Sequence, residues 1–460
     1  MKAMIRARWA ALVVLTLSGC ANLAPLPEPP PAAPDGPLTV VGRGGRAVSP
    51  EVQRRIERAL EGLGDDGALR NHLAVMESIS DSPLIIGNRV RLLVDGPAAY
   101  ARMFDTISAA RDHVDIEMFI FDEAHNAGRD LSDLLLKKVS EGVVVRVLYD
   151  SLGSRSTPRE FLDKLSNGGV TLCEFNPLAP GRLRKASFTQ RDHRKIVVVD
   201  GRTGFAGGIN FSGTYSSGSR SHRARASEAV KDGWRDTNIE VDGPAVREMQ
   251  ALYAASWEKQ KCSAPPRTPV LRDAPAVGST LLRLDASSTD SRSNETYLAA
   301  LSSLEAAQET IDLTMAYFSP DPRLEKALAA AASRGVRVRL LLPGLLDFGG
   351  ILHAGRAHYT RLLEAGVQIF EEPRALLHAK TLEIDGVLST VGSANWDYLS
   401  FALNDELNVV VVDRDFGSQM RKLFEEDLSH AVRIELDSWQ RRPLRQKLLQ
   451  RFWLTWERLL

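Results

Sequence analysis

The 460-residue sequence has an ordinary globular composition, with 44% apolar and 25% charged residues. Its 58 Lys and Arg residues are balanced by 58 Asp and Glu residues, which excludes a strongly basic chain that binds nucleic acid through its net charge. The composition also excludes a disordered, collagen-like or disulfide-rich protein, and the length predicts two or three domains.

The first twenty residues have the order of a secretory signal peptide. Lys2, Arg6 and Arg8 precede an apolar run at 9–17, and Leu-Ser-Gly then leads to Cys20. This ending resembles the bacterial lipobox, which would make Cys20 the lipidated first residue after removal of 1–19. The alternative is an ordinary signal peptide with an incidental cysteine.

The lipobox reading predicts an exported bacterial lipoprotein that is anchored to a membrane and faces the periplasm. Ala21 and Asn22 follow Cys20, so no aspartate stands at the second position, which in Gram-negative bacteria indicates the outer membrane. Residues 20–49 are predicted to form a lipidated, proline-rich linker, since proline-rich segments are extended and semi-rigid.

Strands and helices then alternate twice in the same order. Helices are predicted over 50–82, before the first unit. In the first half the predicted strands are 90–96, 114–121, 143–149 and 170–174, with helices at 97–112, 129–140 and 157–167. In the second half the predicted strands are 280–284, 311–318, 336–342 and 367–370, with helices at 294–309, 321–334 and 352–365.

Strands that are apolar at nearly every residue, alternating with helices, are typical of α/β sheets covered on both faces. The sequence therefore predicts two copies of one domain, at 83–262 and 280–435. A Pro- and Ser-rich linker at 263–279 separates them.

One pattern of reactive residues stands at the same place in each half. His193, Lys195 and Asp200 precede Gly207-Gly208-Ile209-Asn210, and His378, Lys380 and Asp385 precede Gly392-Ser393-Ala394-Asn395. A single His-x-Lys would be incidental. Two copies with identical spacing, in register with duplicated strands, indicate a functional site.

The spacing has a physical meaning, because residues two apart on a strand share a face. The His and Lys of each motif should point into one pocket, and the Asp-Gly pairs should end their strands in turns. Two facing units would gather two His, two Lys and two Asn side chains around one cleft. Such a cleft suits an anionic phosphoryl centre, with one imidazole as nucleophile and the other as general acid.

Each histidine also needs a group that orients its far ring nitrogen. Asp236-Thr237-Asn238 aligns across the halves with Glu406-Leu407-Asn408. We predict that Asp236 orients His193 and that Glu406 orients His378. Asp200 and Asp385 either belong to the site or close their turns as structural residues.

The two motifs resemble the HKD motifs of the phospholipase D superfamily, over about residues 70–460. The phrases at 190–195, 233–237, 377–381 and 404–406 are similar to those of bacterial cardiolipin synthases. The resemblance implies two pseudo-symmetric phospholipase D-like α/β sandwich domains with the active site at their interface. The position of Gly208 is often Ser in this superfamily, so the first half is expected to lack one polar contact.

The resemblance also implies a metal-free, cofactor-free transfer in two steps through a phosphohistidine. The implied catalytic set is His193, Lys195, Asp200, Asn210, Asp236, His378, Lys380, Asp385, Ser393, Asn395 and Glu406. Phospholipids are the implied substrates, either phosphatidylglycerol alone or phosphatidylglycerol with phosphatidylethanolamine; which lipid is donor and which is acceptor stays open. An alcohol acceptor would make the protein a phosphatidyltransferase of cardiolipin synthase type, and water would make it a hydrolytic phospholipase D. A nuclease of the superfamily is a third alternative, which the charge balance disfavours, so no nucleic-acid partner is expected.

Two further features leave alternatives open. Residues 436–460 predict a basic amphipathic helix with Leu444, Leu448, Phe452 and Trp456 on one stripe; it either lies on an anionic membrane surface or packs on the body. Cys173 and Cys262 are the cysteines that remain after Cys20, and an exported protein either pairs them or leaves them free. No Cys-x-x-Cys or His/Cys cluster indicates a metal site.

Overall fold

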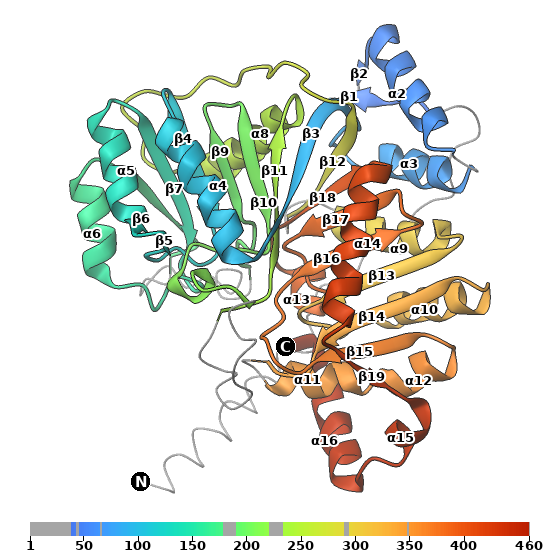
Figure 1. Cartoon of the computed structure of the whole chain (residues 1–460). Coiled ribbons are helices and arrows are strands. Elements are labelled where there is room, and N and C mark those ends of the chain that lie inside the picture. Colours follow the sequence, from blue (N-terminus) through green and yellow to red (C-terminus); the bar gives the residue numbers. More distant parts are fainter. Residues whose placement is uncertain are drawn as a thin grey trace, which may run out of the picture.

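The computed structural model describes residues 38–42, 46–64, 67–177, 190–219, 233–288, 294–346 and 349–459 (Figure 1). The predicted signal peptide and Cys20 lie outside the described residues. A hairpin of β1 (Val41–Gly42) and β2 (Arg46–Ala47) precedes helices α2 (Pro50–Gly62) and α3 (Ala68–Ile79). Leu38 and Val40 are buried, so the chain joins the folded body before the predicted end of the linker at residue 49.

The first half confirms the predicted alternation of strands and helices. Its elements are β3 (Ile85–Val94), α4 (Asp95–Ala109), β4 (His113–Met118), a small hairpin of β5 (His125–Asn126) and β6 (Arg129–Asp130), α5 (Leu131–Ser140), β7 (Val144–Asp150), α6 (Arg159–Asn167), β8 (Thr171–Phe175), β9 (Ile196–Val199), β10 (Thr203–Gly207), β11 (Thr237–Asp242) and α8 (Ala245–Lys259).

The second half repeats this order. Its elements are β12 (Thr280–Ser287), α9 (Glu295–Ala306), β13 (Thr310–Met315), α10 (Pro322–Ser333), β14 (Arg337–Pro343), α11 (Gly349–Arg356), α12 (Tyr359–Glu364), β15 (Gln368–Glu372), β16 (Lys380–Ile384), β17 (Leu388–Gly392), α13 (Tyr398–Ala402), β18 (Glu406–Val412), α14 (Arg414–Leu428) and β19 (Val432–Ile434). The prediction of one helix at 352–365 is wrong. The chain breaks between α11 and α12, where the His358 ring contacts Glu325 of α10 at 2.6 Å.

The strands of both halves form one 15-stranded sheet in the described part of the chain, in the order β19-β15-β14-β13-β16-β17-β18-β12-β3-β11-β10-β9-β4-β7-β8. At its centre β3 and β12 pair antiparallel, with Ile86 opposite Leu281. Outward from this pair, each strand of the first half has its counterpart at the same position in the second: β11 matches β18, β10 matches β17 and β9 matches β16. The predicted pseudo-symmetric duplication is confirmed.

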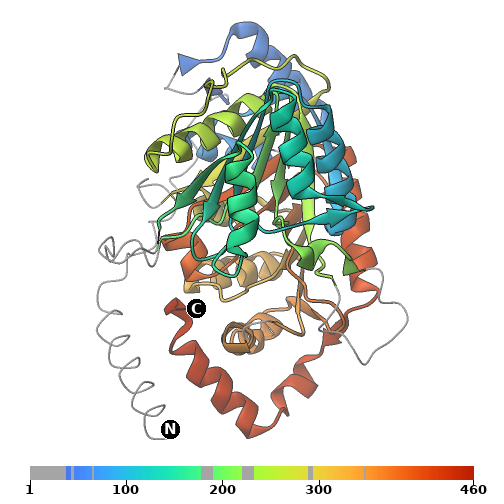
Figure 2. The same cartoon turned by 90° about the vertical axis from the view of Figure 1, so that its left-hand side faces the viewer.

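The apolar strands are buried on both faces, as their continuous hydrophobic runs require. In β9, Val197 and Val199 pack toward the core that α4 covers, whereas Ile196 and Val198 pack into a core shared by the two halves. The shared core also receives Met249 from α8 and, from the second half, Phe416 and Met420 of α14 with Leu282, Leu284, Val409 and Val411. The turned view shows helices on both sides of the first-half strands (Figure 2).

One open question of the sequence is answered, and one predicted element is corrected. Cys173 on β8 and Cys262 beyond α8 form a disulfide, with Cα atoms 5.6 Å apart. The prediction of a single C-terminal helix is wrong, because α15 (Leu436–Gln440), α16 (Leu444–Leu454) and the 3-10 turn η4 (Glu457–Leu459) replace it. Pro443 stands at the break, since proline cannot continue a preceding helix. Among the described residues, no helix has the length and apolarity that crossing a bilayer requires.

Candidate active site

Each histidine motif is tied by backbone hydrogen bonds to the other half of the molecule. The His193 N–H donates to the carbonyl of Asp405, and the Asp405 N–H donates to that of Arg191, each at 2.8 Å. In the mirrored arrangement, the His378 N–H donates to the Arg235 carbonyl at 2.8 Å. These bonds place each motif beside the first residues of β18 or β11 across the domain interface.

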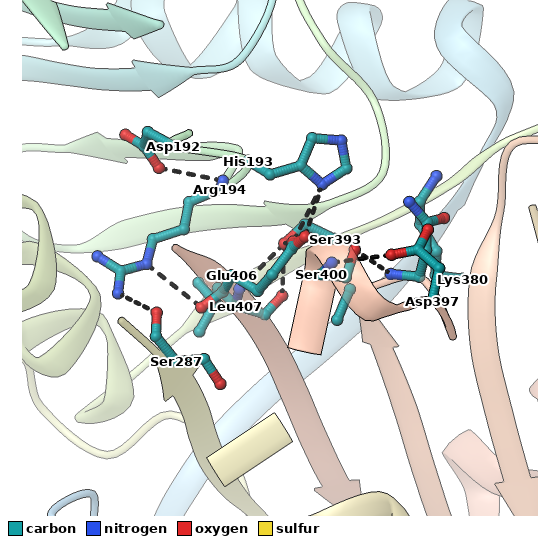
Figure 3. Close-up of polar contacts among 12 residues, drawn as sticks. Asp192, His193, Arg194, Ser287, Lys380, Ser393, Asp397, Ser400, Glu406 and Leu407 are labelled. Carbon is teal, nitrogen blue, oxygen red and sulfur yellow. Dashed lines mark hydrogen bonds and ion pairs between the residues drawn. The ribbon is translucent and has the colours of Figure 1, made fainter. Parts of the chain in front are cut away.

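His193 is therefore oriented by a carboxylate of the second half. Its Nδ1 lies 3.0 Å from both carboxylate oxygens of Glu406 (Figure 3). Ser393 Oγ donates to Glu406 Oε2 at 2.5 Å. Burial raises the pKa of Glu406, but His193, Lys195 and Ser393 outweigh it, and the pKa is lowered overall. An ionised carboxylate can only accept, so Nδ1 of His193 carries a proton.

His378 is oriented in turn by a carboxylate of the first half. Its Nδ1 lies 2.7 Å from Asp236 Oδ2, and the Tyr215 hydroxyl lies 3.3 Å from the same nitrogen. Burial raises the pKa of Asp236 to about 6, although Lys380 opposes the shift. The His378 site thus differs from the His193 site in the electrostatics of its carboxylate.

The predicted pairing of histidines with carboxylates is wrong in both halves. Sequence alignment placed Asp236 with His193 and Glu406 with His378, whereas the structure exchanges them. The physical reason is the backbone bridging: Asp192 lies beside Asp405, and Arg235 lies beside Leu377, as isolated parallel bridges. Glu406 follows Asp405 and therefore contacts His193, and Asp236 follows Arg235 and therefore contacts His378.

The two motif lysines are buried beside their histidines. Lys195 Nζ donates to the His193 carbonyl, and Lys380 Nζ to the His378 carbonyl, each at 2.5 Å. Burial lowers the pKa of Lys195 to about 7; Glu406 opposes this, and the charge on Lys380 adds to it. Lys380 also lowers the pKa of His193, after burial and Lys195. Both motifs therefore belong to one electrostatic cluster, as the predicted single cleft requires.

The asparagine of each motif, and the equivalent positions Gly208 and Ser393, lie next to the histidines and carboxylates. Asn210 accepts from the Ile120 N–H at 2.9 Å and donates to the Tyr215 hydroxyl at 3.2 Å. Asn395 is buried, and its Oδ1 has no hydrogen-bond partner within the described ranges. At Gly208, a Cβ atom would lie 2.1 Å from Asp236 Oδ1. The polar contact that Ser393 makes is absent there, and the shorter Asp236 occupies the space.

Asp200 and Asp385 do not lie with the histidines. Each stands in the turn after its strand with φ of 55°. Asp200 accepts backbone N–H bonds from residues 111–113 at 2.8–2.9 Å, and Asp385 from residues 308–310 at 2.7–2.8 Å. Both carboxylates therefore fix the start of the neighbouring strand, at the end of β9 or β16 that is remote from the motif histidine.

Aromatic side chains around the histidines were missed by the sequence reasoning. Phe119 lies 4.9 Å from His193, ring centre to ring centre. His378 has three aromatic neighbours: Trp234 at 4.9 Å, Tyr215 at 6.2 Å and Tyr317 at 6.4 Å. Trp234 stands two residues before Asp236, which was the available signal. Tyr215 carried none, because its position depends on the loop after β10.

Arg194 lies behind the site, on the face opposite His193. Its guanidinium donates to the carbonyls of Glu406 at 3.3 Å and Ser287 at 2.7 Å (Figure 3). It also donates to Ser256 Oγ at 3.1 Å. It thus joins the first motif to β18 and β12 of the second half. No group of three or more His, Cys, Asp or Glu side chains suited to a metal ion occurs in the described part of the chain.

Comparison with known proteins agrees with this geometry. Residues 103–221 and 300–428 match the family described as cardiolipin synthase, PLD-like domain, so each matched region contains one motif. The chain is 34% identical over 375 residues to cardiolipin synthase A of Pseudomonas syringae, covering 81% of this chain and 76% of that protein.

A second relative and a solved structure extend the comparison. The cardiolipin synthase of Alkalihalophilus pseudofirmus is 30% identical over 403 residues, covering 87% of this chain and 78% of that protein. The crystal structure of phosphatidylserine synthase from Haemophilus influenzae has a TM-score of 0.61 and 14% identity, covers 88% of this chain and 99% of its own, and shares the fold. The chain therefore belongs to the cardiolipin synthase family of phospholipase D-like enzymes, and it is an enzyme of the phosphatidyltransferase and phosphodiesterase type.

Proposed function

We propose that the enzyme is a cardiolipin synthase that transfers a phosphatidyl group through a covalent phosphohistidine. One observation carries the proposal: His193 and His378 each have Nδ1 held by a buried carboxylate from the opposite half. Holding Nδ1 fixes the orientation in which Nε2 is the reactive nitrogen of each ring, and the two rings belong to one charge cluster. This is the arrangement that a nucleophile and a general acid acting on one phosphorus need.

In the first step, one imidazole Nε2 attacks the phosphorus of phosphatidylglycerol. The bond from phosphorus to the glycerol headgroup oxygen breaks, and the other imidazole protonates that oxygen. In the second step, the now neutral second imidazole takes the proton from a hydroxyl of another phosphatidylglycerol. That oxygen attacks phosphorus, the P–N bond breaks, and cardiolipin and free histidine result. Phosphatidylethanolamine would serve as donor in the same way, with ethanolamine leaving.

The environment of His193 suits the attacking imidazole. Burial and the neighbouring lysines lower the pKa of His193, which favours the neutral ring that attack requires. Lys195, Lys380 and the two asparagines would stabilise the charge on the non-bridging oxygens, which is commonly the largest catalytic contribution.

We also propose that the protein is an exported lipoprotein, held through Cys20 on the periplasmic side of the outer membrane. The order of Lys2, Arg6, Arg8, the apolar run and Cys20 supports this. Cys20→Ser should release the protein into the soluble periplasmic fraction. Unchanged sedimentation with membranes would contradict the anchor.

The experiment that tests the activity uses purified enzyme with phosphatidylglycerol, with and without phosphatidylethanolamine or glycerol, and mass analysis of the lipid products. Cardiolipin is the expected product, and EDTA should not reduce its yield. Phosphatidic acid alone would identify the enzyme as a hydrolytic phospholipase D. His193→Ala and His378→Ala should each abolish turnover, whereas His430→Ala, an exposed histidine far from both motifs in sequence, is the matched control.

A further inference from the structure

Helix α16 carries an apolar stripe that the other described residues leave uncovered. Leu444, Leu448 and Phe452 are 69%, 60% and 55% exposed, and Leu449 beside them is 39% exposed. At about 100° per residue, Leu444, Leu448 and Phe452 follow one another at steps of about 40° and form one continuous stripe, and Leu449 lies about 60° beyond Phe452. Elsewhere in the described chain, the exposed large apolar residues are Leu152, Val270, Leu271, Val277, Leu345 and Val432.

Helix α16 packs against α11 of the body, and a series of contacts through the preceding residues fixes its orientation. Gln450 is 3% exposed and accepts from the Arg442 guanidinium at 2.9 Å. Arg442 stacks on Trp439 at 4.3 Å, and the Trp439 ring lies 5.0 Å from that of Tyr359 in α12. The face around Gln450 therefore meets the body, and the stripe faces outward. This arrangement argues against the alternative in which the apolar stripe packs on the body.

The stripe is surrounded by positive charge. Arg445, Lys447 and Arg451 are exposed on α16, whereas Arg441 pairs with Asp437 and Arg442 contacts Gln450. The one acidic residue from Trp439 to the C-terminus is Glu457. Glu457 is engaged inward, with Ser319 Oγ at 3.3 Å and His358 Nε2 at 3.3 Å. Exposed apolar side chains flanked by Lys and Arg are complementary to an anionic lipid surface.

The C-terminal segment also lies at the catalytic edge of the sheet. Glu457 contacts Ser319, two residues beyond Tyr317, whose ring lies 6.4 Å from the ring of His378. Arg458 lies 5.9 Å over the ring of Tyr398, three residues beyond Asn395. Figure 1 shows α15 and α16 projecting from the second half, away from the linker 263–279.

We infer that the stripe Leu444, Leu448, Leu449 and Phe452, with its flanking basic residues, docks on an anionic phospholipid bilayer and turns the catalytic edge toward the lipid headgroups. The inference rests on the proposed function, since it gives the site access to a membrane substrate. It is distinct from the Cys20 anchor, which tethers the chain but does not orient the body.

A fluorescent label on α16 tests the docking directly. The disulfide occupies Cys173 and Cys262, so Leu448→Cys gives the lipidated full chain one free thiol for an environment-sensitive fluorophore. We expect a blue shift of its emission on vesicles of equimolar phosphatidylglycerol and phosphatidylcholine, and a smaller shift on phosphatidylcholine alone. Val270→Cys is the matched control, because Val270 is 59% exposed and its segment is held at the opposite edge, where Arg267 donates to the Asp112 carbonyl. Equal shifts at both positions, or none at Leu448→Cys, would overturn the inference.

Comparing turnover of vesicle-bound and monomeric substrates distinguishes a defect in membrane docking from a defect in catalysis. Leu448→Glu with Phe452→Glu should lower turnover of phosphatidylglycerol in vesicles by about tenfold or more. Turnover of a short-chain, monomeric phosphatidylglycerol should be unchanged, and Val270→Glu should affect neither substrate. Equal loss on both substrates, or a dimer that the double variant converts to a monomer, would overturn the inference. If the label shifts but no phospholipid is converted, the proposed function fails and the docking surface stands.

Discussion

His193 of the first half is held by Glu406 of the second, with Nδ1 3.0 Å from both carboxylate oxygens. His378 and Asp236 repeat this relationship in the opposite direction at 2.7 Å. Neither half therefore contains a motif histidine together with the carboxylate that orients it. The site exists where the two domains meet, and the central pairing of β3 with β12 and the shared apolar core hold it together.

The crossed pairing predicts which histidine each carboxylate variant disturbs. Glu406→Gln should change the NMR signal and titration of the His193 imidazole and leave those of His378 close to wild type, and Asp236→Asn should do the reverse. Turnover should fall by a factor on the order of 10² to 10⁴ in each variant, the range expected when proton transfer is impaired. Nitrogen-15 NMR of histidine-labelled enzyme is the measurement. A change confined to His378 in Glu406→Gln would contradict the crossed arrangement.

Gly208 and Ser393 occupy equivalent positions in the two motifs, and we expect substitutions at them to have different effects on stability and turnover. A serine at position 208 would bring Cβ to 2.1 Å from Asp236 Oδ1, so Gly208→Ser should displace that carboxylate and cost about 1–3 kcal/mol as overpacking. Ser393→Gly removes one hydrogen bond to Glu406 and should retain the thermal transition with reduced turnover. Thermal unfolding and turnover of both variants check this. Wild-type turnover in Gly208→Ser would show that the space is not limiting.

Much of this architecture could be predicted from the sequence, because the signals are local. Apolar runs and their alternation gave the strands and helices, and the repeated motif gave two facing units. The pairing of each histidine with the carboxylate of the opposite half could not be predicted in this way. Asp236 and Glu406 align across the halves, and alignment alone favours pairing within a half. The exchange depends on the bridges of Asp192 with Asp405 and Arg235 with Leu377, which join residues far apart in the sequence.

The motif aspartates show a second limit. Asp200 and Asp385 share the spacing of the histidines and lysines, so spacing could not separate a catalytic from a structural role. Their backbone N–H bonds do so, because each carboxylate is occupied at a strand start remote from the motif histidine. By contrast, the break at Pro443 was readable from the sequence, since proline begins helices more readily than it continues them.

We predict that Arg194, which lies behind the first motif, positions Glu406 beside His193. It bonds the Glu406 carbonyl, whereas the equivalent Ala379 packs among Leu341, Leu377 and Phe424. Arg194→Lys keeps the positive charge but removes the guanidinium that bonds several partners at once. We expect kcat to fall by about tenfold, the equivalent of one lost hydrogen bond, with KM nearly unchanged. Arg191→Lys is the matched control, because Arg191 is also buried but its side chain bonds Ser151. Equal effects of the two variants would assign Arg194 a merely structural role.

Because of the disulfide, we expect the stability of the protein, but not its turnover, to depend on reductant. Cys173 lies on the edge strand β8, and the bridge closes a sequence separation of 89 residues. Its loss should lower the free energy of unfolding by about 2–5 kcal/mol while turnover at low temperature is preserved. Urea unfolding with and without reductant measures the effect. The double variant Cys173→Ser with Cys262→Ser should not respond to reductant, and a wild-type chain equally insensitive would contradict the prediction.

Buried Asp397 predicts how stability depends on pH. Burial raises its pKa to about 7, assisted by Glu406 and opposed by the Ser400 N–H and Lys380. The folded protein therefore binds this proton more tightly than the unfolded chain, whose pKa is near 3.8. The stabilising contribution is complete below about pH 4 and is lost as the pH rises through 7.

Asp397→Asn keeps the acceptor that caps α13, where the Ser400 N–H donates at 2.8 Å, but cannot ionise. Its stability relative to the wild type should therefore increase between pH 5 and pH 8 by about 2–4 kcal/mol, at 1.36 kcal/mol per pKa unit. Asp397→Ala, measured in parallel, should show the same pH trend with a constant loss of about 1 kcal/mol from the missing cap. Urea unfolding at several pH values gives all three curves. A difference between Asp397→Asn and the wild type that stays constant with pH would mean that Asp397 is ionised throughout, paired more strongly with Lys380 than its burial indicates.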